Sequence, residues 1–251
     1  MVSPHPSRPT AARTVAAATA ATAPRPLGPF VLLIAFVLIA VALGVMGRVT
    51  STSTFRGAWE LSRLGGPWLA GAFVAGMLAG WRRPRAAPSG GAARTLLLGA
   101  SGGAIAVAGG SLTYYAIYRW IEDATTTWYA VVVGTGWALA GLAVGGALGV
   151  LGALTTMATA RQGVRGLAIG VMAGLLMGES IALLWVWEDG GLRKMALLEG
   201  AGGCVVLGGA ILVGWRAVIA SLPAAMVTAT FAPLAATALR ETLRRFGWGG
   251  A

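Results

Sequence analysis

The chain has 251 residues, of which 57% are hydrophobic and 11% are charged, and its formal net charge is +11. Because soluble domains average about 25% charged residues, this composition excludes an ordinary soluble protein and indicates apolar runs separated by short charged clusters. One cysteine excludes a disulfide within the chain. The one histidine, His5, lies in a polar tail, so no apolar segment offers a histidine to a haem, a zinc ion or a catalytic serine. We therefore expect no cofactor and no metal.

Seven apolar segments follow the polar tail. Residues 1–28 are rich in Ala, Pro, Thr and Ser and lack periodic apolar residues, so we expect a disordered tail. Residues 29–47 are long enough to cross a bilayer as a helix, and a second helix is expected to begin at Pro67, since proline suits a first-turn position. Further helices are expected at about 95–118, 128–156, 166–187, 195–214 and 217–239, before a short basic tail at 240–251.

These segments predict an all-α fold, a polytopic membrane bundle of about seven transmembrane helices over residues 29–239. The chain contains 39 glycines, well above the usual share of about 7%. Such a composition favours close helix packing, because small residues let backbones approach each other. In the second segment, Gly71, Ala75 and Ala79 recur every four positions and predict one packing face.

The distribution of charge predicts the orientation of the bundle. The N-terminal tail, the 82–94 loop, the Arg161–Arg165 loop and Arg216 are basic and fall on one side of the alternating helices. Cytoplasmic loops carry an excess of Lys and Arg, so we expect this side, and the N-terminus, in the cytoplasm. The arginines of the C-terminal tail then fall outside, unless the last helix is re-entrant or the helix count differs.

Two acid pairs, Glu122–Asp123 and Glu188–Asp189, lie on the opposite side, next to aromatic residues. Tyr and Trp favour the membrane–water interface, so the aromatic residues predict an interfacial belt capped by solvated acids. The belt residues are Tyr114, Tyr115, Tyr118, Trp120, Trp128, Trp185 and Trp187. In a second interpretation the acid pairs hold a divalent metal with a phosphate-bearing lipid. Neither pair has a spaced acidic or histidine partner, so we favour a protein without catalytic residues over a membrane enzyme.

Glu179 and Glu199 are the acids that lie within apolar segments. A charge in the middle of a membrane helix costs about 2.5–3.5 kcal/mol or more, and such residues usually face the bundle interior on an ion, proton or substrate path. Both acids lie one to three turns from the same side of the membrane, so we expect them to face one cavity, with Ser180 and Thr113 as further ligands. The alternatives are a purely structural Glu179, and a Glu199 that pairs with Arg193 or Lys194.

A shift of the sequence by 66 residues predicts an internal repeat. Glu122–Asp123 then aligns with Glu188–Asp189, and Gly134 aligns with Gly200. Each unit would contain a helix, an aromatic end, an acid pair and a glycine-rich helix, as in the parallel repeats of transporters. Chance matches in a chain rich in Gly and Ala are the alternative.

The segments "PWLAGAFVAGMLAG", "YYAIY" and "MAGLLMGESIALLW" resemble a group of small polytopic membrane proteins of actinobacteria. The resemblance covers about residues 59–240. The group has no assigned activity, so the resemblance implies a bacterial plasma membrane protein and no particular chemistry.

Two functions follow as hypotheses. In the first, the chain is a small transporter or permease-like subunit, and the intramembrane carboxylate is a proton or cation site. In the second, it is a structural or accessory subunit of a larger membrane complex. Expected partners are membrane lipid and other membrane subunits or an ATPase. We expect no nucleic acid partner, because the basic residues lie in short clusters between apolar runs, where charge sets topology.

Overall fold

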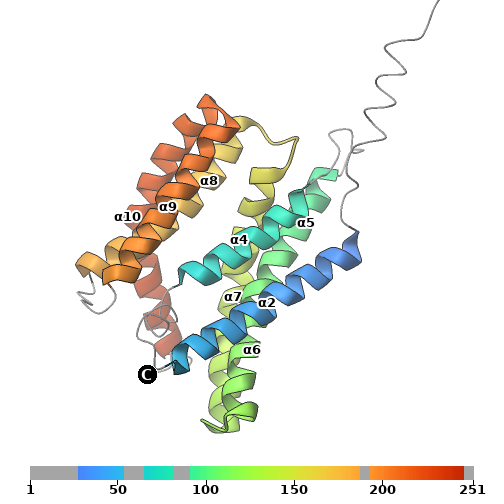
Figure 1. Ribbon diagram of the computed structural model, residues 1–251, viewed down its shortest axis with the longest axis vertical. Coiled ribbons are helices and arrows are strands. Elements are labelled where there is room, and N and C mark those ends of the chain that lie inside the picture. Colours follow the sequence, from blue (N-terminus) through green and yellow to red (C-terminus); the bar gives the residue numbers. More distant parts are fainter. Residues whose placement is uncertain (1–27, 54–64, 82–90, 187–192, 246–251) are drawn as a thin grey trace, which may run out of the picture.

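The computed structural model describes residues 28–53, 65–81, 91–186 and 193–245, and these residues form helices with no strand among them (Figure 1). The all-α prediction is therefore confirmed. The helices are α2 (Pro29–Thr52), α4 (Gly66–Gly80), α5 (Gly91–Ala104), α6 (Gly110–Ala116), α7 (Thr127–Thr156), α8 (Gln162–Ile181), α9 (Arg193–Val213) and α10 (Trp215–Arg245). Wider π-helical turns extend them: η1 (Ile105–Gly109) joins α5 to α6, η2 (Ile117–Ile121) follows α6, and η3 (Ala182–Val186) follows α8.

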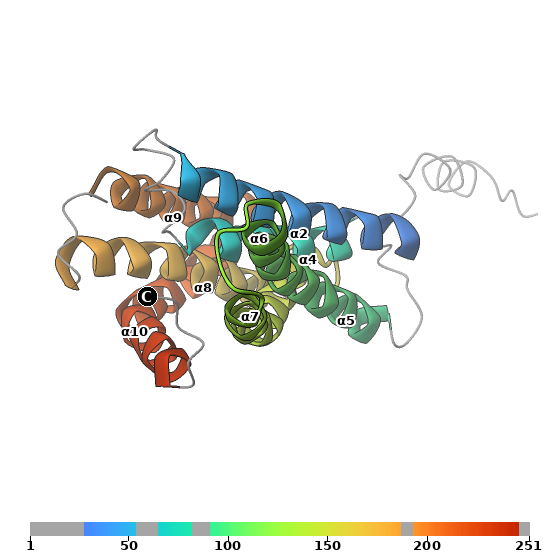
Figure 2. The same ribbon diagram turned by 90° about the horizontal axis from the view of Figure 1, so that it is seen from below.

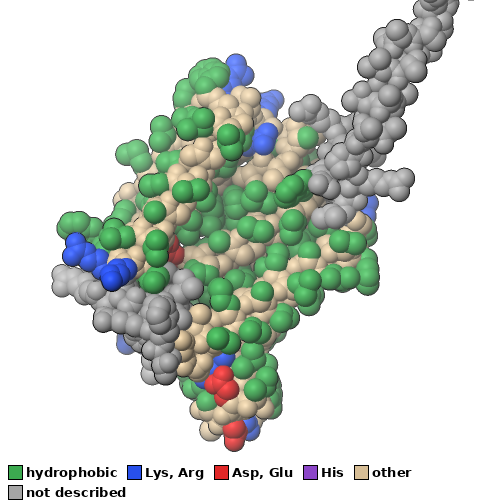
Figure 3. All heavy atoms as spheres, in the orientation of Figure 1, with side chains coloured by type: hydrophobic (Ala, Val, Ile, Leu, Met, Phe, Trp, Pro, Cys, Tyr) green, Lys and Arg blue, Asp and Glu red, His purple; other side chains and the backbone are tan. Residues whose placement is uncertain are grey.

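Six of the described helical segments are long and apolar enough to cross a membrane. The exception is α4, whose 15 residues extend about 22 Å, less than the hydrocarbon thickness of about 30 Å. Figure 3 shows hydrophobic side chains along the flanks of the bundle and most charged side chains near the helix ends. These features are those of a multi-pass membrane protein in which one helix is incomplete.

The helices form two groups that meet along α8 (Figures 1 and 2). The first contains α2, α4, the α5–α6 helix and α7; the second contains α8, α9 and α10. The groups touch where α4 and α7 contact α8. We call the end at which α7 finishes and α8 begins the Arg161 end, and the opposite end, at which α7 begins, the Glu122 end.

Glycine lets α8 and α10 pack backbone to backbone. Gly166, Gly170, Gly174 and Gly178 recur every fourth residue and face Ala217, Ser221, Ala225 and Ala229 of α10 in the same order. A Cβ atom on Gly166 would lie 2.2 Å from the carbonyl oxygen of Ala217. We call this series of contacts the α8–α10 ladder. Over its whole length the two helices are adjacent and parallel, so α10 runs beside α8 in the same direction.

The first group has a similar crossing centred on Gly149 of α7. A Cβ atom on Gly76 of α4 would lie 2.0 Å from the Gly149 carbonyl oxygen, and a Cβ atom on Gly149 would lie 2.0 Å from that of Gly99 in α5. Small residues at helix crossings allow this approach. Three helices thus meet at one point without intervening side chains.

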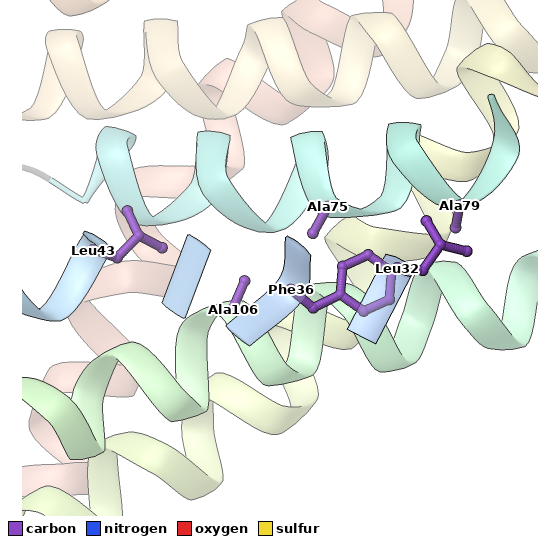
Figure 4. Packing of buried hydrophobic residues seen from close by; sticks show 6 residues of the cluster. All are labelled: Leu32, Phe36, Leu43, Ala75, Ala79 and Ala106. Atoms are coloured by element: carbon purple, nitrogen blue, oxygen red, sulfur yellow. The ribbon is translucent and has the colours of Figure 1, made fainter. Parts of the chain in front are cut away.

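Helix α2 closes the first group through larger side chains. Leu32, Phe36 and Leu43 are buried against Ala75 and Ala79 of α4 and against Ala106 (Figure 4). A Cβ atom on Gly71 would lie 2.6 Å from Leu43. The predicted face of Gly71, Ala75 and Ala79 is therefore a packing face, and its partner is α2.

The observed boundaries differ from the predicted ones mainly at the C-terminus. The expected tail at 240–251 is helical as far as Arg245, where Glu241 pairs with Arg244 and Arg245. Such pairs at spacings of three and four stabilise an exposed helix. Elements of the same kind recur at nearly the predicted repeat distance: α7 and α9 begin 66 positions apart, and η2 and η3, which precede them, begin 65 positions apart.

Candidate functional site

Glu179 and Glu199, which were expected to face one cavity, lie close together although they belong to different helices. Glu179 lies seven residues before the end of η3 and Glu199 six residues after the start of α9. Both are therefore about 10 Å from the Glu122 end, at 1.5 Å per residue. The two side chains are close enough to interact electrostatically.

The N-terminus of α4 lies against both carboxyl groups. The Gly65 amide donates a hydrogen bond to Glu179 Oε1 at 2.5 Å. A Cβ atom on Gly66 would lie 1.7 Å from Glu199 Oε1, so only glycine lets the carboxyl group rest on the backbone here. The first amides of a helix lack intrahelical acceptors and carry partial positive charge. Because α4 is short, this positive end lies at the depth of the two acids.

Glu199 is buried without a hydrogen-bond partner. Its exposed fraction is 8%, and among the described residues neither carboxylate oxygen accepts or donates a hydrogen bond. Arg193 and Lys194 are exposed. The alternative in which Glu199 pairs with one of them is therefore wrong, because its side chain points into the bundle toward α4.

Ser180 and Thr113 differ in their relation to the acids. Ser180 is buried, and a Cβ atom on Gly200 would lie 2.8 Å from its Oγ atom, which places it in the α8–α9 contact beside Glu199. The Thr113 hydroxyl donates to the Gly109 carbonyl of its own helix at 2.8 Å, and its Cβ atom packs on Gly44 of α2. The role of Thr113 as a ligand stays a prediction, and in this arrangement its hydroxyl bonds to its own backbone.

Trp68 positions the first turn of α4. Cβ atoms on Gly47 and Gly110 would lie 3.0 and 2.8 Å from its indole ring. The ring is therefore held between α2 and α6, two residues after Gly66. Trp68 could not be identified from the sequence, because the glycines that receive it belong to distant segments.

At the Glu122 end, the first acid pair is part of an ion-pair network. Arg48 Nε donates to both oxygens of Glu122 at 2.9 Å, and the Arg48 guanidinium carbon lies 4.2 Å from the centre of the Tyr118 ring and 5.6 Å from that of Tyr114. The Arg48 guanidinium holds the pKa of the Glu122 carboxyl below its usual value. Arg48 was not predicted as a site residue, because it directly follows the apolar segment at 29–47.

The remaining belt and acid residues lie in an ion pair, in an aromatic cluster or exposed at the surface, where the structure describes them. Asp123 pairs with Arg119. Trp120, Trp128 and Trp185 are exposed, and Tyr114, Tyr115 and Tyr118 form one ring cluster. The other predicted residues, Trp187, Glu188 and Asp189, lie outside the described residues. Within the described ranges, no three His, Cys, Asp or Glu side chains are grouped to hold a metal ion.

No protein-family model, curated protein or solved structure matches this chain.

Proposed function

We propose that the protein is a small transporter or permease-like subunit of a bacterial plasma membrane, and that the Glu179–Glu199 pair is its proton site. One observation carries this proposal: two carboxyl groups from adjacent helices meet the N-terminus of a short helix at a depth of about 10 Å along the helices.

The arrangement matches the physical needs of transport. Acidic residues inside a membrane are costly and mark proton or substrate paths. Discontinuous helices whose N-termini end inside the membrane are typical of transporter binding sites. Glu199 is buried beside Glu179, so the gain or loss of a proton on Glu199 changes the interaction between the two carboxyl groups.

The site also lies where the two helix groups meet. Glu179 and Glu199 belong to the second group and α4 to the first. Figure 3 shows the surface hollowed between α9 and α4. Relative movement of the groups would therefore change the surroundings of both carboxyl groups, which is what alternating access requires.

The test is proton flux in reconstituted vesicles. An inward pH gradient is imposed with the potential clamped, a pH dye is enclosed, and amino acids, amines, sugars and monocarboxylates are added in turn. We expect one class to accelerate acidification of the lumen, and Glu179→Gln and Glu199→Gln each to reduce that rate at least tenfold, because neither amide takes up a proton.

Glu241→Gln is the matched control, since Glu241 lies at the exposed end of α10 and pairs with arginines there. It should retain the flux of the unmodified chain. Protein-free vesicles correct for passive leak. Equal flux in all three variants, or no response to any class from a monodisperse protein, would contradict the proposal.

A second candidate is an accessory subunit of a membrane complex. The observation that favours it is the open glycine face of α9, where Cβ atoms on Gly202, Gly208 and Gly209 would meet nothing within 4 Å. Purification in mild detergent followed by mass spectrometry separates the two proposals. A stoichiometric membrane subunit or ATPase favours the accessory function, and a stable protein without partners favours the self-contained transporter.

A further inference from the structure

The start of α4 is built to receive a carboxylate. Gly65 and Gly66 carry no side chains, and the Gly65 amide already donates to one carboxylate, that of Glu179. The second carboxylate, that of Glu199, rests against Gly66. Backbone amides at a helix N-terminus form a general anion site. Glu199 therefore occupies the position that an external carboxylate would take.

Glu199 is held there less firmly than Glu179. It is 8% exposed, and both of its oxygens lack hydrogen bonds to described residues, which is costly for a buried carboxylate. Protonation would remove its charge and with it the attraction to the positive end of α4. A protonated Glu199 would thus leave the Gly66 amide available to another anion. It is the one amide of this turn that remains, because Pro67 has no N–H and the amides of Gly65, Trp68 and Leu69 already donate.

From these contacts we propose that the ligand is a small organic monocarboxylate, which replaces the Glu199 side chain at Gly66 when Glu199 takes up a proton. This inference rests on the proposed function and specifies its substrate class. The ligand brings one negative charge and Glu199 binds one proton, so the charge of the site is unchanged. Each transport cycle would move one proton and one carboxylate together and carry no net charge.

Among the described residues, the titratable group next to Glu199 is Glu179, which the Gly65 amide holds by a hydrogen bond. Glu179 is the charged residue that interacts with Glu199, and α4 has no charged residue from Gly66 to Gly80. On α9 itself, Arg193 and Lys194 are exposed. On α8, Arg165 donates to the Thr155 carbonyl. The described charged residues of α10 with contacts of their own are Arg216, Glu241, Arg244 and Arg245, which lie against Trp215 or pair with one another.

The test is equilibrium binding to the purified full-length protein, which does not depend on flux. Acetate, propionate and benzoate, and the matching neutral amides, are titrated by calorimetry at pH 6 and pH 8 in buffers of different ionisation enthalpy. We expect at least one carboxylate, and none of the amides, to bind. Its affinity should rise by up to about tenfold per unit fall in pH, with uptake of about one proton per molecule bound.

Two variants and one control sharpen the test. Glu199→Gln, which mimics the protonated state, should bind the carboxylate with no dependence on pH and no proton uptake. Gly66→Ala should weaken binding at least tenfold, because its Cβ atom would occupy the carboxylate position. Gly202→Ala adds a Cβ atom to open space and should bind like the unmodified chain.

The outcomes separate the two proposals. Equal binding of carboxylates and amides, no binding of either, or a pH dependence that survives Glu199→Gln would overturn the carboxylate inference. Proton flux that depends on Glu199 but responds to another solute class would leave the proposed function standing. The absence of both binding and proton flux would overturn both.

Discussion

Arg48 is nearly completely buried, although arginine is among the most costly residues to bury. It is tolerated because Glu122 neutralises its charge and the rings of Tyr114 and Tyr118 cover its face. The sequence shows Glu179 and Glu199 as acids inside apolar runs, so they could be predicted. Arg48 could not, because it lies where an apolar run ends, and its partner is 74 residues away.

We expect Glu122→Gln to destabilise the protein by about 1–3 kcal/mol near neutral pH, since the buried Arg48 would lose its charged partner. The folded pKa of Glu122 is below its unfolded value. The stabilisation is therefore present above the unfolded pKa and is lost as the pH falls through the folded pKa. Thermal unfolding in detergent at pH 7 and at a pH near 3 measures both effects.

Asp123→Asn is the control for this variant, because the Asp123 side chain is 84% exposed and exposed pairs contribute little. It should unfold like the unmodified chain at both pH values. A Glu122→Gln variant as stable as the unmodified chain at pH 7 would show that the Arg48 pair is not structural.

The positions of the helices could be predicted from the apolar runs of the sequence. The contacts between the helices could be predicted less well. All seven predicted helices begin within about four residues of the observed start, as expected when boundaries are read from pattern alone. The four-residue glycine spacing of α8 is visible in the sequence, but its partner is not, because many small-residue faces in this chain could pair. The depth at which α4 starts was also not predictable, since it depends on Trp68 and the glycines that receive it.

We expect Gly170→Ala to destabilise the protein by about 1–3 kcal/mol, the usual cost of overpacking. A Cβ atom at this position would lie 2.3 Å from the Ser221 carbonyl oxygen, so α8 and α10 would have to separate. Gly208→Ala in α9 is the control. Both substitutions raise helix propensity, but the Cβ atom at position 208 enters open space. Unfolding temperatures of the two variants isolate the packing effect, and equal temperatures would contradict the α8–α10 ladder.

For the whole molecule, the structure places basic residues without acidic ones at the Arg161 end. Among the described residues this end carries Arg94, Arg161, Arg165 and Arg216 and no Asp or Glu. The positive-inside rule therefore still predicts that the Arg161 end faces the cytoplasm. Because α10 runs parallel to α8, its last turn with Arg244 and Arg245 lies at the other end, and the re-entrant alternative is not needed to place it.

Single cysteines test this orientation in a Cys204→Ser background. With a membrane-impermeant maleimide on intact bacterial cells, we expect labelling of Ala124→Cys and Thr242→Cys, which lie at the Glu122 end, and protection of Thr159→Cys at the Arg161 end. All three should react after lysis. Labelling of Thr159→Cys alone in intact cells would contradict the predicted orientation and show that the Arg161 end faces the outside.

The glycine crossings also determine how much conformational entropy the side chains lose when the helices pack against one another. Helices in a membrane are formed before they pack, so their backbone is already ordered when two of them meet. A side chain that becomes buried loses rotamer freedom, whereas glycine and alanine have none to lose. Among the described residues, most of the buried hydrophobic side chains are those of alanine. This bundle therefore gains close contact between helices while immobilising few side chains, which compensates for the weak hydrophobic drive between helices in lipid.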